Sequence, residues 1–217
     1  MLRPPPVEPA SLEDLPAYEI GGTTLHRVWR AGASAERAAP WWFSSHTGPD
    51  GGRFDLAAPI GTLYTSTSRV GALIGALQAL LTNLPVEEIE ARRSATITVP
   101  DATPPAADLC NPSLAGKGIT AGVWAGTERD LTQQWAAAVR RDGWWALRTG
   151  IHHDPSGHLR AVAIFGTTGD GAPTLGGVWS YAASSLHDDP EIRAELSLYG
   201  IAVRSGGELP FTDEVPN

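Results

Sequence analysis

The sequence has a single cysteine, Cys110, so no internal disulfide can form and no cysteine cluster suggests zinc. A nucleophilic thiol needs a paired base, and the sequence points to none, so we interpret Cys110 as a structural thiol. The start of the chain lacks the apolar stretch of a signal peptide, and no segment approaches the length of a bilayer span. We therefore expect a cytoplasmic protein without a membrane segment.

The chain also lacks the basic balance of a general nucleic-acid binder, because its net charge is -8 and its pI is about 5.2. We predict no direct contact with nucleic acid. A small anionic ligand stays compatible with this charge, since a few local arginines can hold phosphates on an acidic protein. With 217 residues and 42% hydrophobic residues, the chain has the size and composition of one globular domain.

Strand and helix patterns alternate irregularly, which favours a single α+β domain over a doubly wound sheet. A proline-rich arm is expected over 1–20, a domain over 21–204 and a tail over 205–217. The clearest helix is expected from Ser68, a good cap, to Leu84, and a second from Thr127 to Gly143. We expect strands at 23–29, 61–68, 94–100, 144–151 and 159–166, a loop at 101–118, a polar turn at 152–158, and a short helix leading into a last strand over 189–203.

Two arginines are candidates for binding an anion. Arg27 lies within a strand pattern, where an unpaired guanidinium is expensive to bury and is therefore paired or functional. Arg53 lies in the segment GPDGGRFD, whose glycines allow a close backbone approach to a phosphate. The alternative for Arg53 is an ion pair with Asp50 or Asp55 in an exposed turn.

Hydroxyl and imidazole groups form two further candidates. Tyr64 and the hydroxyl residues that follow it, 65–68, could line a ribose pocket, or they could be an ordinary strand end with a helix cap. The segment HHDPSGH, at 152–158, reads as a turn or as the source of one acting histidine. Adjacent histidines on a strand point to opposite faces, so we predict no metal site there.

The eight tryptophans include two adjacent pairs, Trp41-Trp42 and Trp144-Trp145. In an alternating strand, one member of each pair faces outward, which suggests a pocket wall or a partner surface, including a second copy of the chain. The alternative is that both members pack inside the protein. No P-loop, GxSxG, HExxH or Rossmann glycine pattern is present.

Several ordered motifs together resemble the RES-domain family. They are LHRVWRA (25–31), WFSSHTGPDGGRFD (42–55), GTLYTSTSRVGALIGALQAL (61–80), RDLTQQWAAAVRRDGWWALRTGIHHDPSG (129–157) and LSLYGIAV (196–203). The resemblance implies a fold like that of ADP-ribosyltransferase toxins. It also implies consumption of NAD at the nicotinamide–ribose bond, by hydrolysis, phosphorolysis or transfer, and a helical antitoxin as partner.

The resemblance also assigns roles to residues of this chain. NAD is implied as the substrate, held by Arg27, Arg53, Tyr64 and Ser66, with Arg27, Tyr64, Thr149 and His153 as the catalytic candidates. The family is named for an Arg, a Glu and a Ser. The Arg falls on Arg27, whereas the Glu falls on Gly75 and the Ser falls on Ile151, with Thr149 as the nearest hydroxyl.

The missing carboxylate leaves three hypotheses. Losing one preorganised electrostatic partner typically costs about 10²–10³ in rate, because nothing then stabilises the positive charge that develops on the ribose. The first hypothesis is an enzyme whose replacement acid is Asp50, Asp55 or Asp154, or comes from the substrate. The second is a silent protein that binds a nucleotide or a partner protein. The third is an intact toxin whose Glu and Ser do not fall on Gly75 and Ile151. Its carboxylate then comes from elsewhere, and Glu87 and Glu88 are the nearest acids after the helix.

Overall fold

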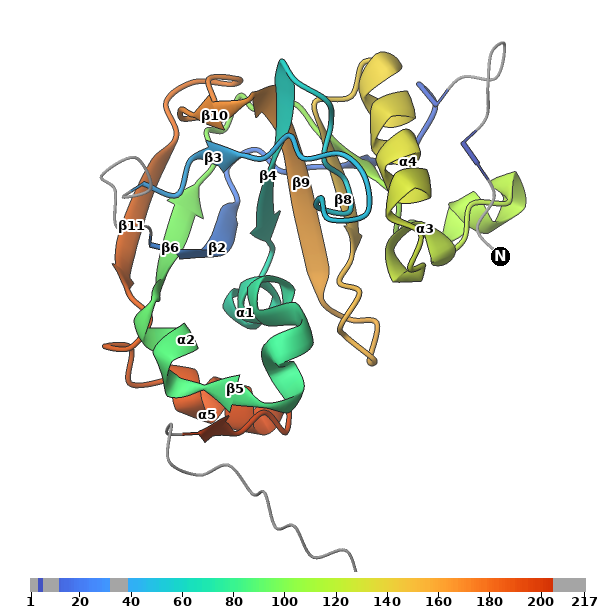
Figure 1. The fold of residues 1–217 in the computed structure, drawn as a ribbon. Helices are drawn as coiled ribbons and strands as arrows, with labels where there is room; N and C mark the ends of the chain where they lie inside the picture. Colours follow the sequence, from blue (N-terminus) through green and yellow to red (C-terminus); the bar gives the residue numbers. More distant parts are fainter. Residues whose placement is uncertain (1–3, 6–11, 32–38, 205–217) are drawn as a thin grey trace, which may run out of the picture.

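The computed structural model describes residues 4–5, 12–31 and 39–204, and it shows one large sheet with helices around it (Figure 1). Eight strands follow the order β1-β7-β8-β9-β4-β2-β6-β11, and all neighbours are antiparallel except β7 and β8. The strands are β1 (Ala17–Tyr18), β2 (Thr24–Arg30), β4 (Ile60–Ser66), β6 (Arg92–Thr98), β7 (Ala106–Asp108), β8 (Ala146–Gly150), β9 (Arg160–Thr167) and β11 (Ser180–Ser185). This mixed architecture confirms the predicted α+β class.

Two small sheets accompany the large one. Strand β10 (Gly169–Asp170) pairs with β3 (Trp42–Phe43), and β12 (Val203–Arg204) runs parallel to β5 (Leu84–Pro85). The helices are α1 (Arg69–Leu77), α2 (Val86–Glu90), α3 (Gly122–Ala125), α4 (Arg129–Arg141) and α5 (Ile192–Leu198), together with the 3₁₀ helices η2 (Gln78–Thr82) and η3 (Pro112–Lys117). None of the helices in the described part of the chain is both long and apolar enough to cross a membrane.

The large sheet opens between β2 and β4. These two strands share one register pair, His26 with Ser66, whereas β4 pairs with β9 along its whole length and β2 does so with β6. Two halves of the sheet therefore diverge from this point, and α1 lies below it (Figure 1). At this opening, the Tyr64 carbonyl of β4 accepts a hydrogen bond from the Arg27 side chain of β2.

Helix α1 begins as the sequence predicts and ends earlier. The Ser68 hydroxyl accepts a hydrogen bond from the Gly71 N–H at 3.2 Å, which is a standard N-cap. The prediction of one helix through Leu84 is wrong, because Gln78 takes a φ of 44° and the chain continues as η2. This turn lets Leu80 and Leu81 pack against the cluster beneath α1.

Helix α4 ends before Gly143, whose φ of 95° suits glycine, so the predicted stop is confirmed. The predicted cap at Thr127 is wrong, since Glu128 is the N-cap and makes no side-chain capping bond. The loop expected over 101–118 is also wrong, because it contains β7 and η3. Pairing with β8 and β1 creates β7, and the sequence had no local signal for it.

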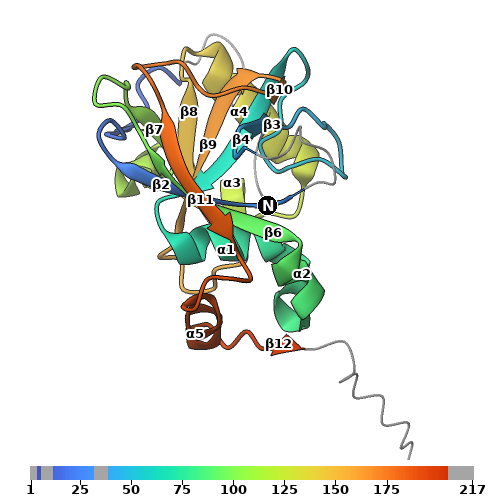
Figure 2. The ribbon, with the colours of Figure 1, turned by 90° about the vertical axis from the view of Figure 1, so that its left-hand side faces the viewer.

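Three clusters of buried side chains form the core. One lies between the sheet and helices α3 and α4, and includes Trp135 and Leu147. A second includes Leu25 and Trp41, and a third joins α1 to α2 and α5 through residues such as Leu73 and Leu196. Figure 2 shows α5 and β12 below the sheet, with β11 in front.

The end of the N-terminal arm packs onto the domain. Leu12, Leu15 and Ile20 are buried, and β1 extends the sheet beyond β7. Both backbone polar groups of Leu12 are hydrogen-bonded to the domain. Its N–H donates to Asp142 Oδ2 at 2.7 Å, and its carbonyl accepts from Trp144 Nε1 at 2.9 Å. Residues 12–20 therefore contribute to the core.

Candidate functional site

Arg27 lies where the sheet opens. Its Nη1 donates to the Tyr64 carbonyl at 3.4 Å and its Nη2 donates to the Trp42 carbonyl at 3.2 Å. The buried Nε has no partner in the described structure, and no carboxylate there pairs with the guanidinium. Burial lowers the pKa of Arg27 to about 10. Arg27 is therefore a cation that joins β2, β3 and β4 through carbonyl groups, while its Nε has no partner in the described structure.

Arg53 is held in the loop between β3 and β4 and is 8% exposed. Its Nη1 donates to the carbonyl of Gly126, and its own carbonyl accepts from Thr132 Oγ1 at 2.5 Å. Burial, and next the neighbouring Arg129, lower the pKa of Arg53 to about 10. Arg53 forms no ion pair with Asp50 or Asp55, which was the alternative that the sequence left open.

Tyr64 fixes the turn that carries Arg53. Its hydroxyl donates to Asp55 Oδ1 at 2.8 Å and accepts from the Phe54 N–H at 2.8 Å. Burial, followed by the Asp55 charge and hydrogen bond, raises the pKa of Tyr64 well above its usual value. The phenol is thus neutral and already hydrogen-bonded. Tyr64 also connects the two arginines, because its carbonyl accepts from Arg27 while its ring supports the Arg53 turn.

Asp55 is the structural partner of that turn. Its Oδ2 accepts from Ser44 Oγ at 2.6 Å and from the Gly52 N–H at 2.9 Å, in addition to the Tyr64 bond on Oδ1. The carboxylate is 1% exposed. A side chain at Gly52 would place its Cβ 2.5 Å from the Tyr64 hydroxyl, so the turn requires glycine there. Asp55 is therefore occupied in shaping the turn and is a poor replacement acid.

Arg129 and two histidines complete a group that we name the basic cluster, namely Arg53, Arg129, His152 and His153. The pKa of His152 is lowered by burial, then by Arg53 and Arg129, while hydrogen bonds with the backbone at Trp124 and Ala125 oppose the shift. The pKa of His153 is lowered by burial, then by His152, Arg53 and Arg129. The two imidazole rings stack edge to face, with centroids 4.7 Å apart.

The basic cluster is assembled from three distant segments: the loop before β4, the first turn of α4 and the turn after β8. Neither Arg53 nor Arg129 has an ion-pair partner in the described ranges. The sequence predicted Arg53 and His153 as site residues, and Arg129 was not among the predicted residues. A signal for Arg129 existed, because a basic residue in the first turn of a helix faces the positive end of the helix dipole.

Among the small hydroxyl residues of the prediction, Thr65, Ser66 and Thr149 are buried, whereas Thr67 and Ser68 are half-buried. Ser66 Oγ donates to the Arg160 carbonyl at 2.7 Å and accepts from the Ser68 N–H at 3.2 Å. Thr149 is fully buried, and its Oγ1 has no partner in the described structure. Both residues are in register with Ala161 of β9, so Ser66, Ala161 and Thr149 form one row across three strands. In this arrangement Thr149 carries a hydroxyl that solvent does not reach.

The two positions on which the resemblance places the family Glu and Ser, Gly75 and Ile151, differ in their surroundings. A Cβ built at Gly75 meets nothing within 4 Å, so this face of α1 is open. Gly75 lies one turn beyond Gly71 and Ala72, and Ala72 lines a cavity of about 90 Å³ together with His26 and Arg27. Ile151 is 7% exposed and packs in the cluster under α1, where its Cδ1 lies 2.9 Å from a Cβ built at Gly71.

The other proposed replacement acids are committed elsewhere or exposed. Asp154 accepts from Ser156 Oγ at 2.5 Å and from the Leu159 N–H at 2.7 Å. Burial opposes ionisation of Asp154, but these hydrogen bonds hold its pKa below the usual value. Glu88 pairs with Arg30 and Arg92. Asp50 and Glu87 are not buried, and none of the four forms an ion pair with the basic cluster.

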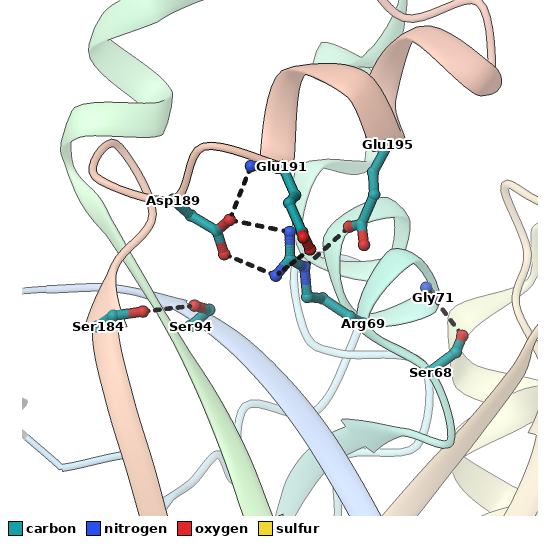
Figure 3. A network of polar contacts seen from close by, with 8 residues as sticks. All are labelled: Ser68, Arg69, Gly71, Ser94, Ser184, Asp189, Glu191 and Glu195. Atoms are coloured by element: carbon teal, nitrogen blue, oxygen red, sulfur yellow. Dashed lines mark hydrogen bonds and ion pairs between the residues drawn. The ribbon is translucent and has the colours of Figure 1, made fainter.

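A second polar network, shown in Figure 3, includes Arg69 and Asp189, which line the same cavity as Arg27. Arg69, the first residue of α1, contacts Asp189 Oδ2 at 2.8 Å, Glu195 Oε2 at 2.9 Å and Glu191 Oε2 at 3.7 Å. Together these contacts fasten α5 to α1. The charge of the Arg69 guanidinium is thus neutralised by these carboxylates. The part of the chain that the structure describes holds no group of three or more residues suited to a metal ion.

The tryptophan pairs alternate as expected for strands. Trp41 and Trp145 are buried in the second core cluster, whereas Trp42 and Trp144 are half-buried. Trp145 also stacks edge to face with Trp179 at 6.2 Å. The outer members contact the protein as well, since the Trp42 carbonyl binds Arg27 and the Trp144 ring binds Leu12.

The fold is a mixed α+β domain whose large sheet opens beside Arg27. Comparisons with known proteins give its family. The RES domain model matches residues 25–184, so the chain belongs to the RES-domain family. Among solved structures, the chain is similar to one in the crystal structure of the M. tuberculosis MbcT–MbcA toxin–antitoxin complex. The TM-score is 0.56 at 15% identity, over 82% of this chain and 92% of that one. No curated protein matches the chain.

Proposed function

We propose that the chain binds the diphosphate of NAD or a related nucleotide at the basic cluster. The observation that carries the proposal is the pair Arg53 and Arg129, which come from distant segments, lie close enough to depress the pKa of Arg53, and have no carboxylate partner in the described ranges. Two unneutralised guanidinium groups beside two histidines form a site for an anion, because arginine binds phosphate in a bidentate manner.

We further propose a RES-type enzyme that acts on the nicotinamide–ribose bond with altered catalytic groups. Arg27 supplies a buried positive charge, and Thr149 supplies a buried hydroxyl two positions before the expected family Ser. Gly75 and Ile151 offer neither a carboxylate nor a hydroxyl. The expected reaction is cleavage or transfer of the ADP-ribosyl group at a rate lowered by about 10²–10³ relative to a family site with its Glu.

A second candidate is a silent nucleotide-binding protein, and one observation favours it. Asp55 and Asp154 use their oxygens to hold turns, and Glu88 is paired with arginines. If no carboxylate reaches the ribose, the oxocarbenium-like charge has no partner and turnover stops while binding remains. This candidate shares the basic cluster with the first.

The resemblance to a toxin–antitoxin complex supports a third element of the proposal, a helical antitoxin-like partner acting in the cytoplasm. Expression without that partner would then slow growth and lower cellular NAD. A silent binding protein would do neither.

The test measures binding and turnover separately. Titration calorimetry with ADP-ribose tests the basic cluster, and chromatography for nicotinamide after incubation with NAD, with and without phosphate, tests the reaction. Arg129→Gln should weaken ADP-ribose binding at least tenfold. The matched control is Arg193→Gln, which removes an exposed arginine of α5.

The outcomes separate the candidates. Nicotinamide release that Arg53→Gln abolishes supports the enzyme, and binding without release supports the silent protein. Equal ADP-ribose affinity in wild type and Arg129→Gln contradicts the proposed site.

A further inference from the structure

Strand β11 forms one edge of the large sheet in the described part of the chain. It pairs with β6 from Ser180 to Ser185, and no other described strand pairs with it. It lies at the outside of the sheet in both ribbon views (Figures 1 and 2). The opposite edge is formed by β1, which has only the two residues Ala17–Tyr18. A six-residue edge is thus the longer free edge in the described fold.

The hydrogen-bond parity of β11 shows which backbone groups point outward. The Leu186 N–H donates to the Arg92 carbonyl at 3.0 Å, in step with the β11–β6 ladder. Hydrogen-bonded pairs alternate along an antiparallel ladder, so the even-numbered residues of β11 bind β6. The N–H and C=O groups of Tyr181, Ala183 and Ser185 therefore point away from the sheet and are available to another strand.

The residues of β11 itself lack the features by which edge strands usually block pairing. Edge strands are protected by charged side chains, proline, bulges or a covering element, and SYAASS contains no charge and no proline. Three large apolar side chains lie exposed beside or within it, Leu175 at 41%, Val178 at 90% and Tyr181 at 42%. Exposed apolar groups beside a free edge indicate a protein–protein contact.

We propose that β11 pairs with β11 of a second copy of this chain, antiparallel across a two-fold axis. With the axis at Ala183, that residue faces its own counterpart, Tyr181 faces Ser185, and Ala182 faces Ser184. Every pair joins small or uncharged side chains, so the strand is complementary to itself, as a two-fold interface requires. The chain carries a net charge of -8, which disfavours self-association through charged faces and leaves this neutral edge as the suitable one.

The resulting dimer has one sheet that continues through both copies. Strands of this length give an interface below the standard size of about 1,600 Å², so we expect a dissociation constant on the order of micromolar. This inference does not depend on the basic cluster, although Ala182 and Ser184 line the cavity that Arg27 also lines.

The experiment is sedimentation equilibrium of the full chain from low to high micromolar concentration. The variant Ala182→Glu/Ser184→Glu places two exposed like charges opposite each other, and it should raise the dissociation constant at least tenfold. The matched control, Ser197→Glu/Leu198→Glu, adds the same charge on exposed positions of α5 and should leave it unchanged. Mixing the first variant with Ala182→Lys/Ser184→Lys should restore pairing, which a misfolded variant would not do.

Amide hydrogen exchange provides the second readout. The amides of Tyr181, Ala183 and Ser185 should become protected as concentration rises, while those of the even-numbered residues are protected throughout. A chain that stays monomeric at high micromolar concentration overturns the proposal. So does protection of the three outward amides that is independent of concentration, since part of the same chain would then cover the edge.

Discussion

The Tyr64 hydroxyl donates to Asp55 Oδ1 across 2.8 Å and at the same time accepts from the backbone N–H next to Asp55. This pair joins the middle of β4 to the turn that presents Arg53. Tyr64 was one candidate for the wall of a ribose pocket, and that role stays a prediction. Its hydroxyl is hydrogen-bonded within the protein, so Tyr64 also acts on the basic cluster by positioning a neighbour.

Replacing Tyr64 with Phe should destabilise the protein and weaken ligand binding together. The change leaves one Asp55 oxygen and the Phe54 N–H buried without a partner, which typically costs about 1–3 kcal/mol. Urea denaturation measures the loss, and ADP-ribose titration measures the effect on Arg53. Tyr181→Phe is the control, because Tyr181 is 42% exposed. Unchanged stability of Tyr64→Phe would show that the hydroxyl does not hold the turn.

Restoring the family carboxylate at Gly75 should be tolerated and should raise turnover. Nothing lies within 4 Å of a Cβ at this position, and glycine in a helix is about 1 kcal/mol less favourable than residues such as Glu. Nicotinamide release by Gly75→Glu should rise by about 10²–10³ if the ribose binds beside this face of α1.

Gly75→Gln provides the control of equal size without charge. If both variants release nicotinamide at the wild-type rate, the ribose does not bind near Gly75. Adding Ile151→Ser tests the second missing group, and it should cost stability by a few kcal/mol because Ile151 is buried in the core.

The histidines of the basic cluster should make stability depend on pH. Their folded pKa values lie below the ordinary 6.5, so the unfolded chain binds more protons in the region just below that value. The free energy of unfolding therefore rises with pH there, and stability is lost as pH falls from about 7 toward 5.5. Denaturation at several pH values should show this slope, and His153→Gln should reduce it.

An anion bound at the basic cluster should reverse the trend for affinity. A phosphate beside His152 and His153 favours their protonated forms, so ADP-ribose should bind more tightly at pH 6 than at pH 8. Affinity that is independent of pH in this range would place the anion away from the histidines.

The sequence by itself determined much of the local structure and the family. The β-branched and aromatic residues of β2 and β4, the Ser68 cap and the Gly143 stop are local features of the chain, and they were predictable for that reason. The spacing of ordered motifs pointed to the RES-domain family, which the family match confirms. The placement of the family Glu on Gly75 and of the family Ser on Ile151 rests on the resemblance and stays a prediction.

Only the tertiary structure decided what these residues do. Strand β11 has small, exposed residues without an apolar alternation, and β7 has three residues, so both exist through pairing with neighbours distant in sequence. Arg129 lies near Arg53 because α4 packs beside the loop before β4. The carboxylate of Asp55 is not available as a catalytic acid because it accepts hydrogen bonds from Tyr64, Ser44 and Gly52. Such convergence depends on contacts between residues far apart along the chain, and local sequence patterns do not encode it.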